Sequence, residues 1–170
     1  MSQKALDRAK QILGAIITSS HAHAGDETVV VETAKIHQVL KTLRDDGEIP
    51  FDFLVDLTAV DYLGRPQDQA RYEVVYHLRS MKTGCRLRVK ALLEDPDDAG
   101  TIPVISTVTD LWKGADWFER EVWDLYGIKF EGHKDLRRIL MYEEFIGHPL
   151  RKDYPKEKRQ PLIRRDPNDV

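Results

Sequence analysis

Apolar residues recur at helical spacing in two places within the first fifty residues. The first set predicts an amphipathic helix within residues 1–20 and comprises Leu6, Ala9, Leu13, Ile16 and Ile17. The second set follows the i, i+3, i+4, i+7 pattern and comprises Ile36, Val39, Leu40 and Leu43. Thr33 can cap that helix and Gly47 can end it. Between the two helices, residues 21–27 are polar and predict a loop, and the β-rich residues 28–32 predict a short strand.

Three later segments alternate between apolar and polar residues with a period of two. They lie within residues 51–58, 72–79 and 85–93, and residues 81–84 are a plausible hairpin turn between the last two. Such alternation gives a sheet one apolar and one polar face. It favours an antiparallel sheet with helices packed on one face over a doubly wound parallel sheet.

Two more helices are predicted before residue 127. Pro103 suits a first helical turn, and an apolar stripe follows it at Val104, Val108, Leu111 and Trp112. The second helix runs to about Tyr126, with Asp116 and Glu119 spaced as a capping box and Gly127 as the residue after its end. The pattern therefore predicts an α+β fold with a mainly antiparallel sheet.

The last forty residues have a different character. From residue 131 onward there is little periodicity, and prolines recur at 149, 155, 161 and 167. Between residues 148 and 165 seven basic residues stand against two acids. We therefore divide the chain into an α+β domain, 1–130, and an extended, irregular basic arm, 131–170. Alone, such an arm could not bury enough apolar surface to offset its ordering entropy, so we expect it to be mobile or to dock on a partner.

The composition of the chain excludes several kinds of binding site and location. The chain has 170 residues, a net charge of −3 and a single cysteine, so it can supply neither the four cysteines of an iron–sulfur cluster nor the pair of a usual zinc site. One cysteine also fits a reducing compartment. No apolar run approaches a membrane span, and the start lacks the features of a secretion signal. The cytoplasm of a bacterium is the simplest location.

Residues that look catalytic have simpler interpretations. No nucleotide-binding glycine motif and no nucleophile elbow occurs. Cys85 falls on the apolar face of a predicted strand and is expected in the core. Glu119 and Glu121 are two apart on a helix, so they point to nearly opposite sides, while Arg120 and Asp124 are four apart and can pair. The alternative, without any function, is that these charged residues form a solvent-exposed face of the helix.

The histidines and the basic arm raise two binding hypotheses. His133 and His148 each follow a glycine, but no third histidine or cysteine lies nearby. Hydrogen bonding that fixes an irregular backbone, or contact with a partner, is therefore favoured over a metal site. The acidic chain and the single aromatic residue of the basic run, Tyr154, argue against nucleic-acid binding.

Three stretches of the chain resemble a known family. Residues 119–128 read Glu-Arg-Glu-Val-Trp-Asp-Leu-Tyr-Gly-Ile, followed by His133, Arg137 and Arg138 at fixed spacing and then by Gly-His-Pro-Leu-Arg-Lys-Asp-Tyr-Pro at 147–155. This combination is similar to the C-type or thirty-kilodalton subunit of the proton-translocating NADH:quinone oxidoreductase, respiratory complex I. Residues 56–62, 72–78 and 114–118 also resemble the family, so the similarity covers roughly 28–160. Lys134 departs from it, because the family commonly has proline there.

The resemblance implies a structural subunit of the complex's hydrophilic arm, without catalysis or a cofactor of its own. FMN and the iron–sulfur clusters would belong to partner subunits. The chain would pack on the large quinone-site subunit of the D type, peripheral to the plasma membrane on its cytoplasmic side. The alternative is an equivalent scaffold role in a membrane-bound hydrogenase or in another relative of the complex that uses a different electron donor. The residues expected to fasten domain, arm and partner are Glu119, Arg120, Glu121, Asp124, His133, Arg137, Arg138, His148, Arg151, Lys152, Asp153 and Tyr154.

Overall fold

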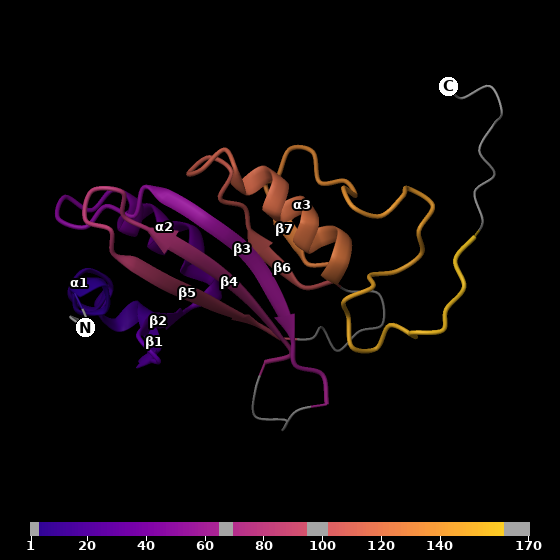
Figure 1. The fold of residues 1–170 in the computed structure, drawn as a ribbon, viewed down its shortest axis with the longest axis horizontal. Helices are drawn as coiled ribbons and strands as arrows, with labels where there is room; N and C mark the ends of the chain where they lie inside the picture. The colour runs from indigo at the N-terminus through magenta and orange to yellow at the C-terminus, as the bar shows by residue number, and fades with distance from the viewer. Residues whose placement is uncertain (1–3, 65–69, 95–101, 162–170) are drawn as a thin grey trace.

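A computed structural model describes residues 4–64, 70–94 and 102–161, and Figure 1 shows their arrangement. The elements are α1 (Lys4–Leu13), β1 (Ile17–His23), β2 (Asp26–Val31), α2 (Ile36–Arg44), β3 (Phe53–Asp61), β4 (Tyr72–Arg79), β5 (Arg86–Leu93), β6 (Val104–Ser106), α3 (Ala115–Tyr126) and β7 (Lys129–Glu131). This is the expected α+β fold.

Five strands form the main sheet in the order β1-β2-β5-β4-β3. Three of its four neighbouring pairs are antiparallel, whereas β2 and β5 run parallel. The sheet is thus mainly antiparallel, as predicted. The parallel pair arises because α2, β3 and β4 lie between β2 and β5 in the sequence, which allows β5 to enter the middle of the sheet in the same direction as β2.

The N-terminal prediction was partly wrong. The helix α1 ends at Leu13, a 3-10 turn follows at Gly14–Ile16, and the residues predicted as helix end and polar loop form strand β1 and the turn into β2. Leu6, Ala9 and Leu13 are buried as expected. Ile17 instead pairs with Val31 across the hairpin. Apolar residues at short spacing fit a helix and a strand equally well. In this chain the pairing of β1 with β2 at the edge of the sheet makes residues 17–23 a strand.

The alternation predicted for residues 51–58 is interrupted. A bulge between Leu54 and Asp56 shifts the register of β3 against β4, so that Leu54 and Leu57 are buried while Phe53 and Val55 are exposed. An extra residue in one strand turns the side chains before it to the opposite face. Phe53 and Val55 therefore lie outside the core, contrary to the prediction.

The helix predicted from Pro103 is also wrong. Val104–Ser106 form β6, which pairs parallel to β7, and α3 connects the two strands in a β-α-β unit. Val108, Leu111 and Trp112 are nevertheless buried, in the turns between β6 and α3. The spacing of these apolar residues correctly predicted that they are buried, but it did not predict that they lie in turns instead of a helix.

Both predicted helix caps differ from the structure. The Thr33 hydroxyl donates to the carbonyl of Leu92 at 2.5 Å, and α2 begins at Ile36 without a side-chain cap. Asp116 lies inside α3, which begins after Gly114, also without a side-chain cap. At the other end, Gly127 has φ +71° and closes the helix as predicted.

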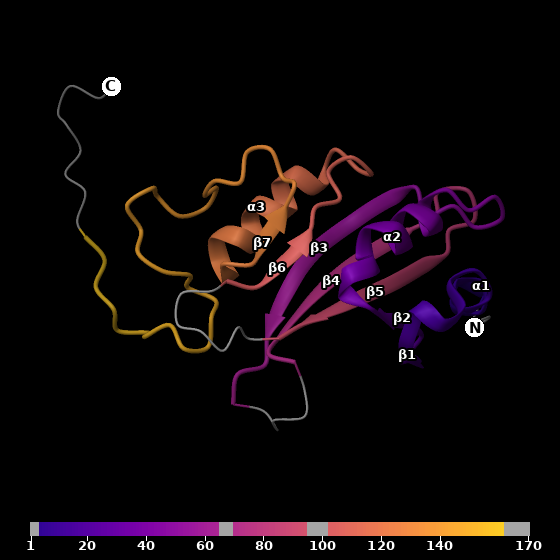
Figure 2. The same cartoon turned by 180° about the vertical axis from the view of Figure 1, so that it is seen from behind.

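One hydrophobic core joins the sheet to all three helices. Tyr72, Val74, Tyr76 and Leu78 of β4 all point into it. Figure 2 shows α2 in front of the sheet, while Figure 1 shows the opposite face. Cys85 precedes β5 and packs against the core, half-buried. The result is a sheet with a helical inner face and an outer face rich in charged side chains.

Candidate functional site

The end of α3 meets the segment that follows β7. A helix leaves its last four carbonyl groups without partners inside the helix, and these need other donors when they are shielded from water. In α3 the amide of Gly127 donates to the carbonyl of Trp123, and the amide of Leu150 donates to that of Leu125. Arg151 Nε donates to the carbonyl of Tyr126 at 2.6 Å. The arm therefore completes the helix.

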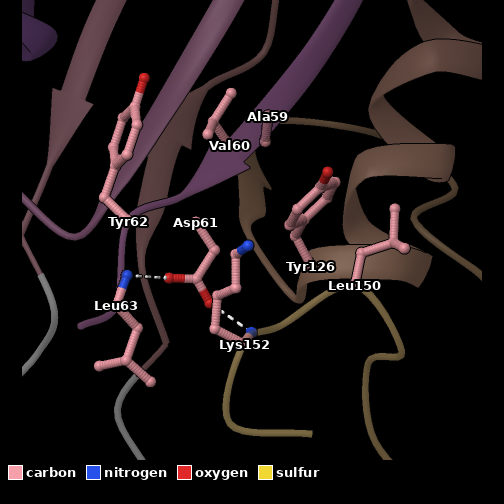
Figure 3. A pocket seen from close by; sticks show the side chains of 8 residues that line it. All are labelled: Ala59, Val60, Asp61, Tyr62, Leu63, Tyr126, Leu150 and Lys152. Atoms are coloured by element: carbon pink, nitrogen blue, oxygen red, sulfur yellow. Dashed lines mark hydrogen bonds between the residues drawn. The ribbon is translucent and has the colours of Figure 1, made fainter. Parts of the chain in front are cut away.

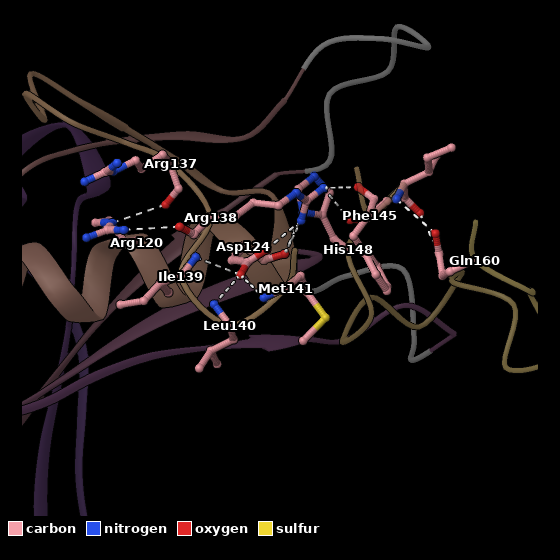
Figure 4. A network of polar contacts seen from close by, with 12 residues as sticks. Arg120, Asp124, Arg137, Arg138, Ile139, Leu140, Met141, Phe145, His148 and Gln160 are labelled. Carbon is pink, nitrogen blue, oxygen red and sulfur yellow. Dashed lines mark hydrogen bonds and ion pairs between the residues drawn. The ribbon is translucent and has the colours of Figure 1, made fainter. Parts of the chain in front are cut away.

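Asp124, in the last turn of α3, is the centre of this contact (Figure 4). Its side chain is fully buried, and Oδ1 accepts a hydrogen bond from Arg138 Nη1 at 2.6 Å. Oδ2 accepts from three consecutive backbone amides, those of Ile139, Leu140 and Met141, at 3.1, 2.8 and 2.8 Å. Burial alone would raise the pKa of Asp124, but the Met141 amide and the Arg138 guanidinium lower it below its ordinary value.

Arg138 shapes the loop that leaves this centre. Its Nη2 donates to the carbonyls of Phe145 and Gly147 at 2.9 and 3.0 Å, while Nη1 is held by Asp124. Residues 138–147 are therefore drawn around one guanidinium group. Arg120 holds the start of the loop by donating to the carbonyls of Arg137 and Arg138 at 3.2 and 3.1 Å. The helical pairing of Arg120 with Asp124 that the spacing suggested is thus replaced by contacts of each residue to the arm.

His148 packs against the helix end. Its Nδ1 lies 3.0 Å from the carbonyl of Asp124, and since a carbonyl only accepts, Nδ1 carries the hydrogen. Burial lowers the pKa of His148, so the ring is neutral at pH 7. The ring meets Trp123 edge to face at 5.5 Å between centroids. This agrees with the prediction that the histidine fixes an irregular backbone.

A second contact joins the arm to the sheet, beside a hollow of about 360 Å³ (Figure 3). Asp61, at the end of β3, is 3% exposed and accepts from the backbone amides of Leu63 and Lys152 at 2.9 and 2.8 Å. Arg71 bridges Asp61 and Asp153, at 3.2 and 2.8 Å. Burial opposes ionisation of Asp61, but Arg71 and these amides keep its pKa below the ordinary value.

Glu119 has a different environment from its neighbours. It is fully buried and accepts hydrogen bonds from the Thr107 hydroxyl at 2.6 Å and the Val108 amide at 2.7 Å. Burial raises its pKa to about 7, against the effect of both hydrogen bonds. Its carboxyl group ties α3 to the turn after β6 and has no basic group of the arm among its hydrogen-bond partners. The solvated-face interpretation fails for Glu119, Arg120 and Asp124, while Glu121 is exposed as its spacing predicted.

The other predicted fastening residues are distributed along the arm. The buried imidazole of His133 lies 3.3 Å from Asp116 Oδ1, and its Nδ1 accepts from the Asp135 amide. Arg137 is exposed and pairs with Asp135 at 3.0 Å. Tyr154 stacks on Phe145 with ring centroids 6.0 Å apart. The side chains of Lys152 and Asp153 are exposed. The structure thus brings Arg120, Asp124, Arg138, His148 and Arg151 together and places the remaining residues around them.

Three residues of these contacts were not predicted. Asp61 and Arg71 fasten the arm to the sheet, and Thr107 holds Glu119. Asp61 continues the buried series Leu57 and Ala59 with a period of two. An acid on the apolar side of a strand must be paired, and that signal could have identified it. Arg71 and Thr107 carry no comparable pattern.

The described residues include neither a membrane-spanning helix nor a cluster of metal-binding side chains. None of the helices within 4–64, 70–94 and 102–161 has the length and apolar character needed to cross a bilayer. The same ranges contain no cluster of three or more histidine, cysteine, aspartate or glutamate side chains arranged to hold a metal ion.

Comparison with known proteins identifies relatives over most of the chain. Residues 29–160 match the family described as the respiratory-chain NADH dehydrogenase, 30 Kd subunit. The C-type subunit of the NADH-quinone oxidoreductase of Ralstonia nicotianae is 45% identical over 156 residues, which cover 90% of this chain and 74% of that protein. The corresponding subunit of Citrifermentans bemidjiense is 44% identical, with 91% and 89% covered.

Two solved structures share the fold. The trypsin-resistant fragment (1–134) of Nqo5 superposes with a TM-score of 0.65 at 33% identity, covering 79% of this chain and 98% of the fragment. A chain of the membrane-bound sulfane sulfur reductase, an archaeal respiratory membrane complex, gives a TM-score of 0.69 at 25% identity, with 91% and 87% covered. The resemblance seen in residues 119–155 is confirmed, and the chain belongs to the 30 Kd subunit family of the respiratory-chain NADH dehydrogenase.

Proposed function

We propose that this chain is a structural subunit in the hydrophilic arm of NADH:quinone oxidoreductase, complex I, and that residues 131–170 dock on the large quinone-site subunit. In this role the chain supports electron transfer from NADH to quinone, coupled to proton translocation, without performing it. FMN and iron–sulfur clusters belong to partner subunits, and the assembly lies on the cytoplasmic face of the plasma membrane. The names of the matched relatives support this role over that of a hydrogenase scaffold.

The observation that carries the proposal is a set of exposed apolar side chains on a loop that the buried ion pair holds in shape. Leu140, Ile146 and Leu150 are 56, 57 and 47% exposed, and Tyr142 is 38% exposed. Leu140, Tyr142 and Ile146 lie on the loop that Asp124 and Arg138 hold in shape, and Leu150 follows it. Apolar side chains held rigidly in water are typical of a surface that a partner covers.

The buried acids act indirectly in this proposal. Glu119, Arg120 and Asp124 are covered by the chain itself, so they serve docking by fixing the arm. Direct contacts are assigned to exposed groups of the arm and of α3, which comprise Glu121, Arg137, Lys152 and Asp153. We propose the same division for the whole chain: residues 1–130 form a domain that holds the arm in place, and residues 131–170 form the arm that contacts the partner.

Retention of the large quinone-site subunit during purification through a tagged version of this chain tests the proposal. Replacing both Leu140 and Ile146 by serine should leave the fold intact, because both side chains are exposed, yet should lower retention about tenfold or more. Leu92→Ser, at a side chain 42% exposed on β5, is the matched control and should retain the partner fully. Deletion of residues 131–170 should abolish retention. Undiminished association of the double variant and of the deletion would refute arm docking.

A further inference from the structure

Strand β1 forms one edge of the main sheet and lacks the features that commonly protect an edge. Edge strands are often guarded by lysine, proline or a bulge, because their free backbone groups can pair with another chain. The residues of β1, Ile17–His23, include no Lys, Arg, Asp, Glu or Pro. Its register against β2 is irregular between Ile17 and Ser19 and regular from Ser19 onward. The opposite edge, β3, carries the bulge at Val55 and lies beside α3 (Figure 1).

The turn between β1 and β2 determines which backbone groups of β1 face outward. Ala24 and Gly25 both have positive φ, 53° and 87°, as in a two-residue type I′ hairpin turn. The strand residue next to such a turn, here His23, is hydrogen-bonded to its partner, and hydrogen-bonded and non-hydrogen-bonded pairs alternate from there. The N–H and C=O groups of Ala22 and Ser20 therefore point away from β2. Among the described residues, no other strand pairs with this edge.

The side chains at this edge are incompletely covered. On the inner face of the sheet, Ile16, Ile17 and Ala22 pack against the core but remain half-buried. On the outer face, Ser19 and His21 line a hollow of about 420 Å³. The edge thus presents apolar side chains on one face and polar side chains on the other. A strand added to β1 would direct its own side chains alternately to these two faces.

We propose that β1 binds an extended segment of a neighbouring subunit, which adds to the five-stranded sheet as a further strand. The backbone groups of Ser20 and Ala22 would donate hydrogen bonds to the backbone of the segment and accept hydrogen bonds from it, which is recognition by β-strand addition. The segment would alternate between apolar residues that cover Ile16 and Ala22 and polar residues beside His21. Free backbone donors and acceptors in a row select another polypeptide backbone as the occupant.

A neighbouring subunit is favoured over a second copy of this chain. Two folded copies joined along so short an edge would bury less than the roughly 1,000 Å² expected of a specific interface, whereas an extended segment can continue along the surface of the chain. The β1 edge lies opposite β3, α3 and the described part of the arm (Figures 1 and 2). The inference therefore goes beyond arm docking and does not depend on it.

Hydrogen exchange at single-residue resolution, in the isolated chain and in the purified complex, tests the proposal. In the isolated chain the amides of Ser20 and Ala22 should exchange rapidly, whereas the amide of His21, which bonds to β2, should exchange slowly. In the complex the amides of Ser20 and Ala22 should exchange at least about tenfold more slowly, and the amide of His21 should change less. Rapid exchange of Ser20 and Ala22 in the complex would overturn the proposal. Slow exchange in the isolated chain that strengthens with its concentration would also overturn it, since the partner would then be a second copy.

A matched pair of variants at Ser20 gives a second measurement. Ser20→Pro removes the outward N–H, which has no partner in β2, so the isolated chain should keep its fold, as measured by circular dichroism. Retention of this variant in the complex should fall about tenfold. Ser20→Thr keeps the N–H and should be retained like the parent. Equal retention of the two variants would contradict strand addition and leave arm docking in place. If Ser20→Pro does not fold, the exchange rates of the parent chain decide.

Discussion

Burial sets the chemistry of Glu119. Because its pKa is about 7 in the folded protein and 4.5 ordinarily, the folded state binds an extra proton between these values, and the free energy of unfolding falls as pH rises through that window. Above about pH 7 Glu119 is ionised in the folded and the unfolded state, and the whole decrease in the free energy of unfolding remains. Glu119→Gln removes the ionisation, so the stability of the variant relative to the parent should increase from pH 5 to pH 8 by about 1–3 kcal/mol. Urea unfolding at both pH values measures this change.

Glu121→Gln, at an exposed position of the same helix, is the control and should show no such trend. If the stability difference between Glu119→Gln and the parent were the same at pH 5 and pH 8, the carboxyl group would not be titrating in this window.

Gly127 is confined by the arm as well as by its backbone. Its φ of +71° favours glycine, and a Cβ placed there would lie 2.5 Å from His148 Cδ2 and 2.8 Å from Arg151 Nη2. Gly127→Ala should therefore lower the free energy of unfolding by about 1–3 kcal/mol and loosen the arm. Gly47→Ala meets nothing within 4 Å and has no positive φ, so it should be neutral or slightly stabilising. Denaturant titration compares the two, and equal stability of the two variants would count against the close packing of His148.

At the scale of elements, α3 and the arm are one unit held by Asp124. Asp124→Ala leaves Arg138 without its counter-charge and three backbone amides without an acceptor, which should cost about 3–5 kcal/mol. Hydrogen exchange at residues 139–141 should accelerate by tenfold or more while the β4 amides remain protected. Glu121→Ala is the control from the same helix. Unchanged exchange at residues 139–141 would mean that these three backbone amides are protected by a contact other than the Asp124 carboxylate.

Prediction from sequence succeeded where an element's own residues determine it. The stripe of α2, the alternation of β4 and β5, and the end of α3 at Gly127 are local patterns, and all match the structure. Prediction from sequence failed where pairing with a strand elsewhere in the chain determines the conformation of a segment. Ile17 became part of a strand because Val31 pairs with it, and Val104 did so because β7 lies beside it. The bulge at Val55 depends on β4 in the same way.

The candidate site shows the same division. Spacing along α3 correctly separated Glu119 from Glu121, but it could not reveal that Asp124 selects Arg138 over Arg120. That choice depends on a loop fourteen or more residues away, which lies over the helix end. Family resemblance supplied the candidate residues, whereas the hydrogen bonds that join some of them could be found only from the fold.

The whole molecule is organised by its five-stranded sheet. The described residues of the arm lie beside α3 at one end of the sheet, and the β4–β5 turn lies at the other (Figures 1 and 2). If the exposed loop of the arm docks as proposed, the five-stranded sheet would hold the rest of the chain in a fixed orientation to that partner. Replacing the exposed apolar side chains of the arm loop should therefore reduce assembly without reducing the stability of the isolated chain.

The way the arm closes the end of α3 has a consequence for synthesis on the ribosome. The carbonyls of Asp124 and Leu125 receive their donors from residues 148 and 150, which are translated more than twenty residues later. Until those residues leave the exit tunnel, the carbonyl of Leu125 has only water as its partner, and the final turn of the helix should fray. The nascent domain would thus remain locally open at the end of α3 until residues 148 and 150 have left the tunnel, and only then would this surface acquire its shape.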